Sequence, residues 1–173
     1  MRKLLFILLY LFLQINVLNA QEHIDLEPLE KKQPVLLISG KDIIYYKLDK
    51  KDALQYSVEG MKKVYLYSRK QIDYKDKPDP YVIAYRFDNS EEVSYVASKI
   101  SSDPKAVYLD RSVKRRPSKY YRKTITVPQN AKKMYVILEK SNDNVDVNVL
   151  TDKSGKKRKV KPEGNFEETI IKT

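Results

Sequence analysis

The stretch Val145-Asp146-Val147-Asn148-Val149-Leu150 decides the fold class of this chain. Apolar and polar residues alternate in it with a period of two, which is typical of a β-strand because successive side chains point to opposite faces of a sheet. We expect the valines to face a core, and Asp146 and Asn148 to face solvent. The pattern therefore predicts a strand with one buried face and one wet face.

Similar short runs, rich in Val, Ile, Tyr and Leu, recur between residues 34 and 150. No stretch of comparable length has the i, i+3, i+4 spacing of an amphipathic helix. Strands at intervals of about 8 to 12 residues predict an all-β fold, here an antiparallel β-sandwich of about nine strands, jelly-roll or immunoglobulin-like. The expected strands are residues 35–39, 43–48, 53–58, 63–68, 81–87, 93–98, 106–109, 120–127, 134–139 and 145–150.

Three short turns predict antiparallel hairpins between these strands. Residues 58–61 contain a glycine where a tight reversal needs a positive φ angle, and residues 88–91 and 141–144 are rich in Asn, Asp and Ser. Residues 70–79 and 110–119 are longer and polar. We expect them to be irregular connections.

The first 20 residues have the order of a secretory signal peptide. Arg2 and Lys3 precede an apolar run over residues 4–13, and a more polar stretch ends at Ala20. The run is shorter than the roughly 20 residues of a membrane-spanning helix, which favours cleavage near Ala20 over an uncleaved anchor. We therefore expect an exported protein, periplasmic, extracellular or associated with the outer membrane, that has no integral membrane span after cleavage.

The remaining chain divides by composition into three parts. Residues 21–33 are polar and lack periodicity, so we expect a tether there. Residues 34–150 carry all the strong strand patterns and form the expected β-sandwich domain. Residues 151–173 are basic and interrupted by Gly and Pro, which predicts a mobile C-terminal tail, with a short ordered segment at 166–171 as an alternative.

Composition excludes several classes of chemistry. The 173 residues include 34 Lys and Arg, 23 Asp and Glu, one His, and no Cys or Trp, for a formal net charge of +11. Without Cys there is no thiol nucleophile, disulfide, cysteine-bound metal or lipoprotein anchor. His23 lies in the expected tether, where no nucleophile is held beside it, and is interpreted as solvated. We expect no enzymatic activity, no metal and no cofactor.

Paired carboxylates are the remaining route to catalysis, since glycoside hydrolysis needs only two. Most acidic residues fall in predicted turns, and the two on predicted strands, Glu139 and Asp146, are at outward positions. Residues 88–92 and 142–146 offer the oxygen ligands that calcium prefers, but neither has the spacing or central glycine of an EF-hand loop. These acids are interpreted as solvated groups and turn residues.

The strongest anomaly is the basic segment 111–123, which holds seven positive charges and no acid. Guanidinium groups pair with phosphate, sulfate or carboxylate, and tyrosine rings offer faces to sugars or cations. In an exported protein this favours an envelope glycan or another anionic surface over nucleic acid, and a merely solvated loop is the alternative. The candidate ligand-binding residues are Arg111, Lys114, Arg115, Arg116, Lys119, Tyr120, Tyr121, Arg122 and Lys123.

Two functions follow from these features. The first is a non-enzymatic recognition or accessory module of the bacterial cell envelope. Its expected contact is an anionic glycan or lipid surface, through residues 111–123. The last three expected strands, with residues 127–131 between two of them, resemble in a general way the closing strands of many carbohydrate-binding-module sandwiches. The second is a structural subunit of an envelope or outer-membrane complex that docks by a sheet edge or by the tyrosine face of Tyr65 and Tyr67.

Overall fold

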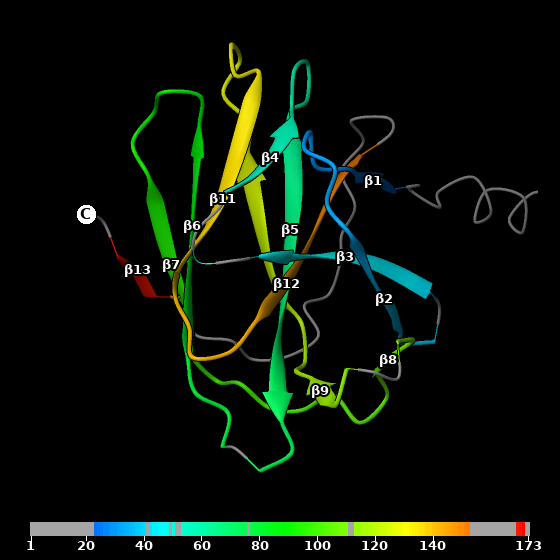
Figure 1. Cartoon of the computed structure of the whole chain (residues 1–173). Coiled ribbons are helices and arrows are strands. Elements are labelled where there is room, and N and C mark those ends of the chain that lie inside the picture. The colour runs from blue at the N-terminus through cyan, green and yellow to red at the C-terminus, as the bar shows by residue number, and fades with distance from the viewer. Residues whose placement is uncertain are drawn as a thin grey trace, which may run out of the picture.

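The computed structural model describes residues 23–40, 42–48, 50, 53–75, 77–110, 113–152 and 169–171. The expected signal peptide, Arg111 and most of the expected basic tail lie outside the described residues. The regular elements of the described residues are all β-strands, and they form two antiparallel sheets (Figure 1). The predicted all-β, sandwich-like class is confirmed. The described residues include no helix with the length and apolar character needed to cross a membrane.

The larger sheet has eight strands. They are β1 (His23–Leu26), β2 (Pro34–Ile38), β3 (Asp42–Leu48), β5 (Lys63–Asp73), β8 (Val107–Tyr108), β9 (Arg115–Pro117), β10 (Tyr121–Thr126) and β12 (Val145–Asp152). The main path of the sheet runs β10-β5-β12-β3-β2-β8, while β1 pairs with β12 and β9 pairs with β5. The neighbouring strands β5 and β12 are therefore paired along both edges and form the centre of this sheet.

The smaller sheet has five strands. They are β4 (Leu54–Ser57), β6 (Tyr81–Phe87), β7 (Val93–Ala97), β11 (Lys133–Lys140) and β13 (Thr169–Ile171). Their order is β13-β7-β6-β11-β4, which places the C-terminal strand at one edge of the sheet (Figure 1). Part of the segment expected as a mobile tail is therefore a strand, at the position given above as the alternative.

The main core lies between the two sheets and has the predicted alternation. Val145, Val147 and Val149 of β12 are fully buried. They share one hydrophobic cluster with the buried set from the smaller sheet and its flanks: Leu54, Tyr56, Val58, Met134, Val136 and Leu138. Burial of each large aliphatic side chain contributes about 1.5 to 3 kcal/mol, so this cluster is the main source of stability.

Two of the three predicted hairpins are wrong. The turn at 58–61 forms as expected, with Gly60 at φ 74° and the Met61 amide donating to the Val58 carbonyl at 3.1 Å. It nevertheless joins β4 of the smaller sheet to β5 of the larger sheet, and residues 141–144 likewise join β11 to β12. Only residues 88–91 connect paired strands, β6 and β7. Turns of similar sequence occur both in a hairpin and where the chain passes from one sheet to the other. The turn residues therefore do not show which strands pair with each other.

The folded unit begins before the expected tether ends. Residues His23–Leu26 form β1, which pairs antiparallel with the last four residues of β12, His23 opposite Asp152. Asp25 of β1 accepts a hydrogen bond from Asn148 Nδ2 at 2.8 Å. The segment was taken as irregular because it is polar, but its polar side chains bond to β12.

The wet face predicted for β12 is wrong, because Asp146 and Asn148 are both buried. The face of the larger sheet that points away from the smaller sheet, here called the outer face, carries a second hydrophobic cluster of Leu37, Tyr45, Ala106 and Tyr108. Its cover comes from β8, which lies within the expected strand 106–109, and from residues 113–118, which belong to a segment expected as an irregular connection and include β9. β5 likewise continues to Asp73, past the end expected for its strand. Because this face is covered, Asp146 and Asn148, the polar residues of β12, are buried as well as its valines.

Two truncations test the C-terminal boundary of the folded unit. Ending the chain after Leu150 instead of Asp152 removes the Thr151 hydrogen bond to the Lys63 carbonyl and the Tyr65 hydrogen bond to Asp152. At about 1 kcal/mol for each bond, we expect the shorter chain to have a free energy of unfolding about 2 kcal/mol lower than the longer one in urea titrations. Equal values would place residues 151–152 outside the cooperative unit.

Candidate functional site

Two opposite charges are buried side by side at the centre of the larger sheet. Arg69 of β5 and Asp146 of β12 are directly paired in register, and their exposed fractions are 1% and 0%. Arg69 Nη1 donates to Asp103 Oδ2 and to the Ser118 carbonyl, both at 2.8 Å, and its Nε donates to the Tyr45 hydroxyl at 3.2 Å. The main acceptors of Arg69 thus come from the chain that covers the outer face, at residues 103 and 118.

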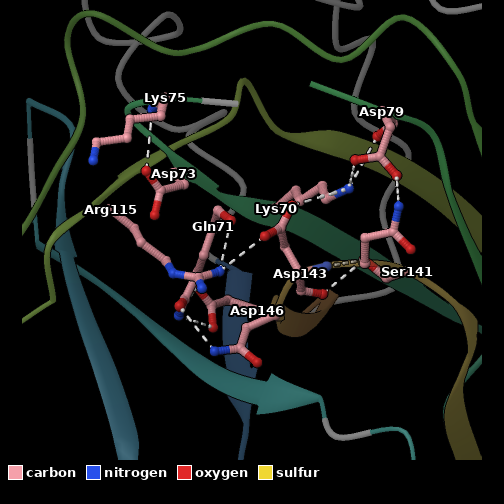
Figure 2. Close-up of polar contacts among 11 residues, drawn as sticks. Lys70, Gln71, Asp73, Lys75, Asp79, Arg115, Ser141, Asp143 and Asp146 are labelled. Carbon is pink, nitrogen blue, oxygen red and sulfur yellow. Dashed lines mark hydrogen bonds and ion pairs between the residues drawn. The ribbon is translucent and has the colours of Figure 1, made fainter. Parts of the chain in front are cut away.

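Asp146 is held by two other donors, of which Figure 2 shows Gln71. Gln71 Nε2 donates to its two carboxylate oxygens at 2.9 and 3.0 Å, and the Tyr108 hydroxyl donates to Oδ2 at 2.8 Å. Burial raises the pKa of Asp146 to about 6, although these hydrogen bonds and the charges of Lys47 and Arg69 act to lower it. Asp146 is therefore a carboxyl group that titrates close to neutral pH.

A separate ion-pair cluster lies where β5 meets the turn between β11 and β12 (Figure 2). The Lys70 ammonium is completely buried and pairs with Asp79 and, at 3.3 Å, with Asp143. Arg115 Nη1 lies 3.0 Å from the other oxygen of Asp143. This cluster compensates the charge of Arg115, which belongs to the predicted basic segment.

Tyrosine rings and cations alternate across the outer face, in what we call the aromatic–cation ladder. The Arg122 guanidinium lies 4.8 Å from the Tyr65 ring centroid and 5.8 Å from that of Tyr67. Tyr67 and Tyr120 are 5.6 Å apart between centroids, and the Arg69 guanidinium lies 5.4 Å from the Tyr120 ring. The complete ladder is His23, Tyr65, Arg122, Tyr67, Tyr120, Arg69 and Tyr45.

His23 is not the solvated residue that the sequence suggested. Its Nδ1 lies 3.1 Å from Asp152 Oδ1, and its ring packs edge-on against Tyr65 at 5.1 Å between centroids. The Tyr65 hydroxyl donates to the other oxygen of Asp152 at 2.8 Å. β1 therefore adds the one histidine of the chain to the end of the ladder. Among the described residues, no group of three or more His, Asp or Glu side chains is arranged to hold a metal ion.

The structure divides the predicted basic segment over several surfaces. Arg122 and Tyr120 lie on the outer face in the ladder. Tyr121 points the opposite way, is buried in the main core and stacks on Tyr95 at 5.5 Å. Lys123 is half-buried and paired in register with Leu66, a residue of the main core.

The rest of the segment is more dispersed. Lys114 and Lys119 are exposed, and Arg115 is paired with Asp143 as described above. The Arg116 guanidinium lies 6.0 Å from the ring of the exposed Tyr74. The eight candidate residues that the structure describes therefore do not form one continuous patch.

Arg116 and Arg122 stand out because their buried Nε atoms have no hydrogen-bond acceptor among the described residues. Neither side chain has a carboxylate within ion-pair distance in that part of the chain. A buried donor without an acceptor is destabilising by about 1 to 3 kcal/mol, and by more when it is charged. In Arg122 the guanidinium is also held on two tyrosine rings, so its position is fixed before any ligand arrives.

The polar centre of the outer face was missed in the sequence. Ser68-Arg69-Lys70-Gln71 continues the strand 63–68 without a turn residue, and this was the available signal. Charged residues at consecutive positions were taken as the start of a solvated connection. The covering chain at residues 103–118, which makes their burial favourable, cannot be seen in a local pattern.

Comparison with known proteins gives no match: neither a protein-family model nor a curated protein is similar to this chain.

Replacing Arg69 with Met tests how much the ion pair of Arg69 with Asp103 stabilises the protein. The change leaves Asp103 without its charged donor and removes the guanidinium next to Asp146, and breaking a buried ion pair in this way costs about 3 kcal/mol or more. Arg86→Met is the matched control, because Arg86 is half-buried and stacks on Tyr135 at 4.1 Å, an interaction worth about 1 kcal/mol. Urea unfolding measures both. Equal losses would show that Arg69 contributes only its packing.

Proposed function

We propose that this protein is an exported, non-enzymatic recognition module of the bacterial cell envelope that binds oxyanion groups of a glycan or lipid headgroup at Arg122. The observation that carries this proposal is the state of the Arg122 side chain. It is fixed over Tyr65 and Tyr67, and no carboxylate of the described residues neutralises it. Arg122 is half-buried, and a carboxylate, sulfate or phosphate group can pair with the accessible part of its guanidinium.

The ladder gives Arg122 the properties of a preformed site. Stacking on aromatic rings immobilises the guanidinium plane, so less side-chain entropy is lost when an anion binds. Tyr65 is itself fixed by its hydrogen bond to Asp152, and Tyr67 is packed against Tyr120. These contacts place a rigid cation on a surface of a strongly basic protein, where long-range attraction to anionic polymers adds to the local pairing.

Within the predicted binding set, the contacts of each side chain favour Arg122 as the centre of the proposed site. Arg115 is already paired with Asp143, and Tyr121 is buried in the main core. Lys119 and Tyr120 precede Arg122 in the chain by three and two positions. Arg116 is a second arginine whose buried Nε has no acceptor among the described residues.

Docking as a structural subunit is the second candidate function, favoured by one specific surface. Leu36, Ile44, Val107 and Leu109 are exposed by 39 to 56% on β2, β3 and next to β8. Leu36 and Ile44 are directly paired, and the Leu109 amide bonds to the Leu36 carbonyl, so three of these side chains are neighbours. The tyrosine face expected to dock is less suitable, because Tyr65 is buried.

Arg122→Gln and Arg115→Gln separate the proposed site from general basic charge. Both variants lose one positive charge, but only the first removes an arginine without a carboxylate partner. We expect Arg122→Gln to weaken binding to sulfated and uronate polysaccharides, or to phosphatidylglycerol vesicles, about ten-fold, and Arg115→Gln to have little effect. Dextran and phosphatidylcholine vesicles are the uncharged controls, and isothermal titration calorimetry measures the affinities.

Salt provides a second readout of the same site. The Debye length falls from about 10 Å at 0.1 M salt to about 3 Å at 1 M, so binding of the parent should weaken over this range. Equal affinities of the parent and Arg122→Gln at low salt would contradict the proposal. A stoichiometric protein complex that survives 1 M salt and is lost in Leu36→Lys would support docking instead.

A further inference from the structure

Residues 103–110, here called the strap, cover the buried charges of the outer face. The strap contains β8, and its Ala106 and Tyr108 side chains are buried in the second hydrophobic cluster with Leu37 and Tyr45. Val107, which alternates with them, is exposed. The strap therefore packs against the second hydrophobic cluster with one face, while β8 itself pairs with β2 at the edge of the larger sheet.

Few backbone bonds hold the strap in place. β8 pairs with β2 over two residues, and the Leu109 amide donates to the Leu36 carbonyl at 3.0 Å. At the other end, the Asp103 amide donates to the Pro117 carbonyl at 2.9 Å. Segments with so few backbone hydrogen bonds open locally at a lower free energy than the central strands.

The side chains of the strap instead bond to the two buried charges. Asp103 accepts from Arg69, and Tyr108 donates to Asp146, each at 2.8 Å. When the strap lifts, water reaches both Arg69 and Asp146. The free energy of strap closure therefore includes the desolvation of these two groups.

We propose that the strap is an acid-tightened cover of the outer face, which closes more firmly when Asp146 binds a proton and opens more readily when Asp146 is ionised. The proposal does not depend on the anion site at Arg122. It depends on a two-point attachment in which one point is a completely buried carboxyl group.

Burial and the charges around Asp146 act in opposite directions on its pKa. Positive charge comes from Arg69 of β5, which already pairs with Asp103, and from the exposed Lys47 of β3, the register partner of Asp146. Burial outweighs these charges and raises the pKa of Asp146 in the closed state to about 6. The groups that face Asp146 from the packed elements are Arg69 and Gln71 of β5, Tyr45 and Lys47 of β3, and Tyr108 of the strap.

Protonation can occur without loss of the attachment. The proton comes from solvent and binds one carboxylate oxygen of Asp146, while the other oxygen still accepts from Gln71. The new O–H donates to the Tyr108 hydroxyl oxygen, which now acts as acceptor and turns its own hydrogen away. The closed state then holds one buried charge fewer.

The magnitude follows from linkage. In the open state Asp146 is hydrated and its pKa returns toward 3.8, whereas in the closed state it is about 6. Closed protein therefore binds more protons than open protein between these values, and acid favours closure. Between pH 7.5 and pH 5 the closing equilibrium constant should rise about ten-fold.

Hydrogen exchange of the Leu109 amide, measured by NMR on the full chain and corrected for intrinsic rates, tests the strap directly. In the parent, we expect protection of this amide to increase about ten-fold from pH 7.5 to pH 5. Asp146→Asn should make the protection independent of pH. Asp152→Asn is the matched control, because Asp152 lies on the same strand and bonds to Tyr65, away from the strap, and should keep the response of the parent.

Tyr108→Phe keeps the carboxyl group and gives a test if Asp146→Asn fails to fold. The Tyr108 hydrogen bond lowers the pKa of Asp146, so its loss should move the midpoint of the protection change to higher pH. A flat pH response in the parent would overturn the proposal. So would an undiminished response in Asp146→Asn, or an unchanged midpoint in Tyr108→Phe.

Discussion

The burial of Arg69 and Asp146 is the constraint on which the outer half of the structure depends. The two residues are paired in register at the centre of the larger sheet, yet Arg69 donates its hydrogen bonds to other residues and Asp146 accepts from others. Removing two charges from water is unfavourable unless their hydrogen-bonding groups are satisfied. Asp103, Ser118 and Tyr108 satisfy them, and all three belong to the chain that crosses the outer face. The cover and the charges are therefore stable only together.

This arrangement explains why the protein has two hydrophobic clusters of unequal size. The cluster between the sheets is large and almost entirely apolar, and it accounts for most of the stability. The cluster on the outer face is small, and its tyrosines Tyr45 and Tyr108 use their hydroxyl groups on Arg69 and Asp146. The same tyrosine-rich surface continues to Arg122 through Tyr120 and Tyr67, which connects the polar centre to the proposed anion site.

The sequence predicted the β-class, most strand positions and the buried face of β12, because a period of two is a local property of the chain. It failed for Asp146 and Asn148, since alternation shows which residues share a face but not whether a distant segment covers that face. The turn at Gly60 was recognised, but its partner sheet was not, because pairing is decided by long-range packing. β1 was missed because its polar residues find partners 123 positions away.

In the candidate site too, features of one short segment were predictable from the sequence, whereas contacts between residues far apart in the chain were not. The basic segment was evident from composition, and its central residue Arg122 remains without a carboxylate partner in the described structure. The pairing of Arg115 with Asp143 was not predictable, because Asp143 lies in a turn 28 residues further along the chain. Tyr65 and Tyr67 were identified as a stripe, but their contact with Arg122 depends on the register of β5 with β10.

Hydrogen exchange on the double variant Arg69→Met, Asp146→Leu tests the central claim most directly. If the buried charges hold the strap, its Leu109 and Asp103 amides should lose most of their protection, while the amide of Tyr85 in β6 of the smaller sheet stays protected. This result would show that polar contacts, more than apolar ones, attach the strap to the sheet. Full protection of the strap amides in the double variant would contradict the account, because apolar packing of Ala106 and Tyr108 would then be sufficient.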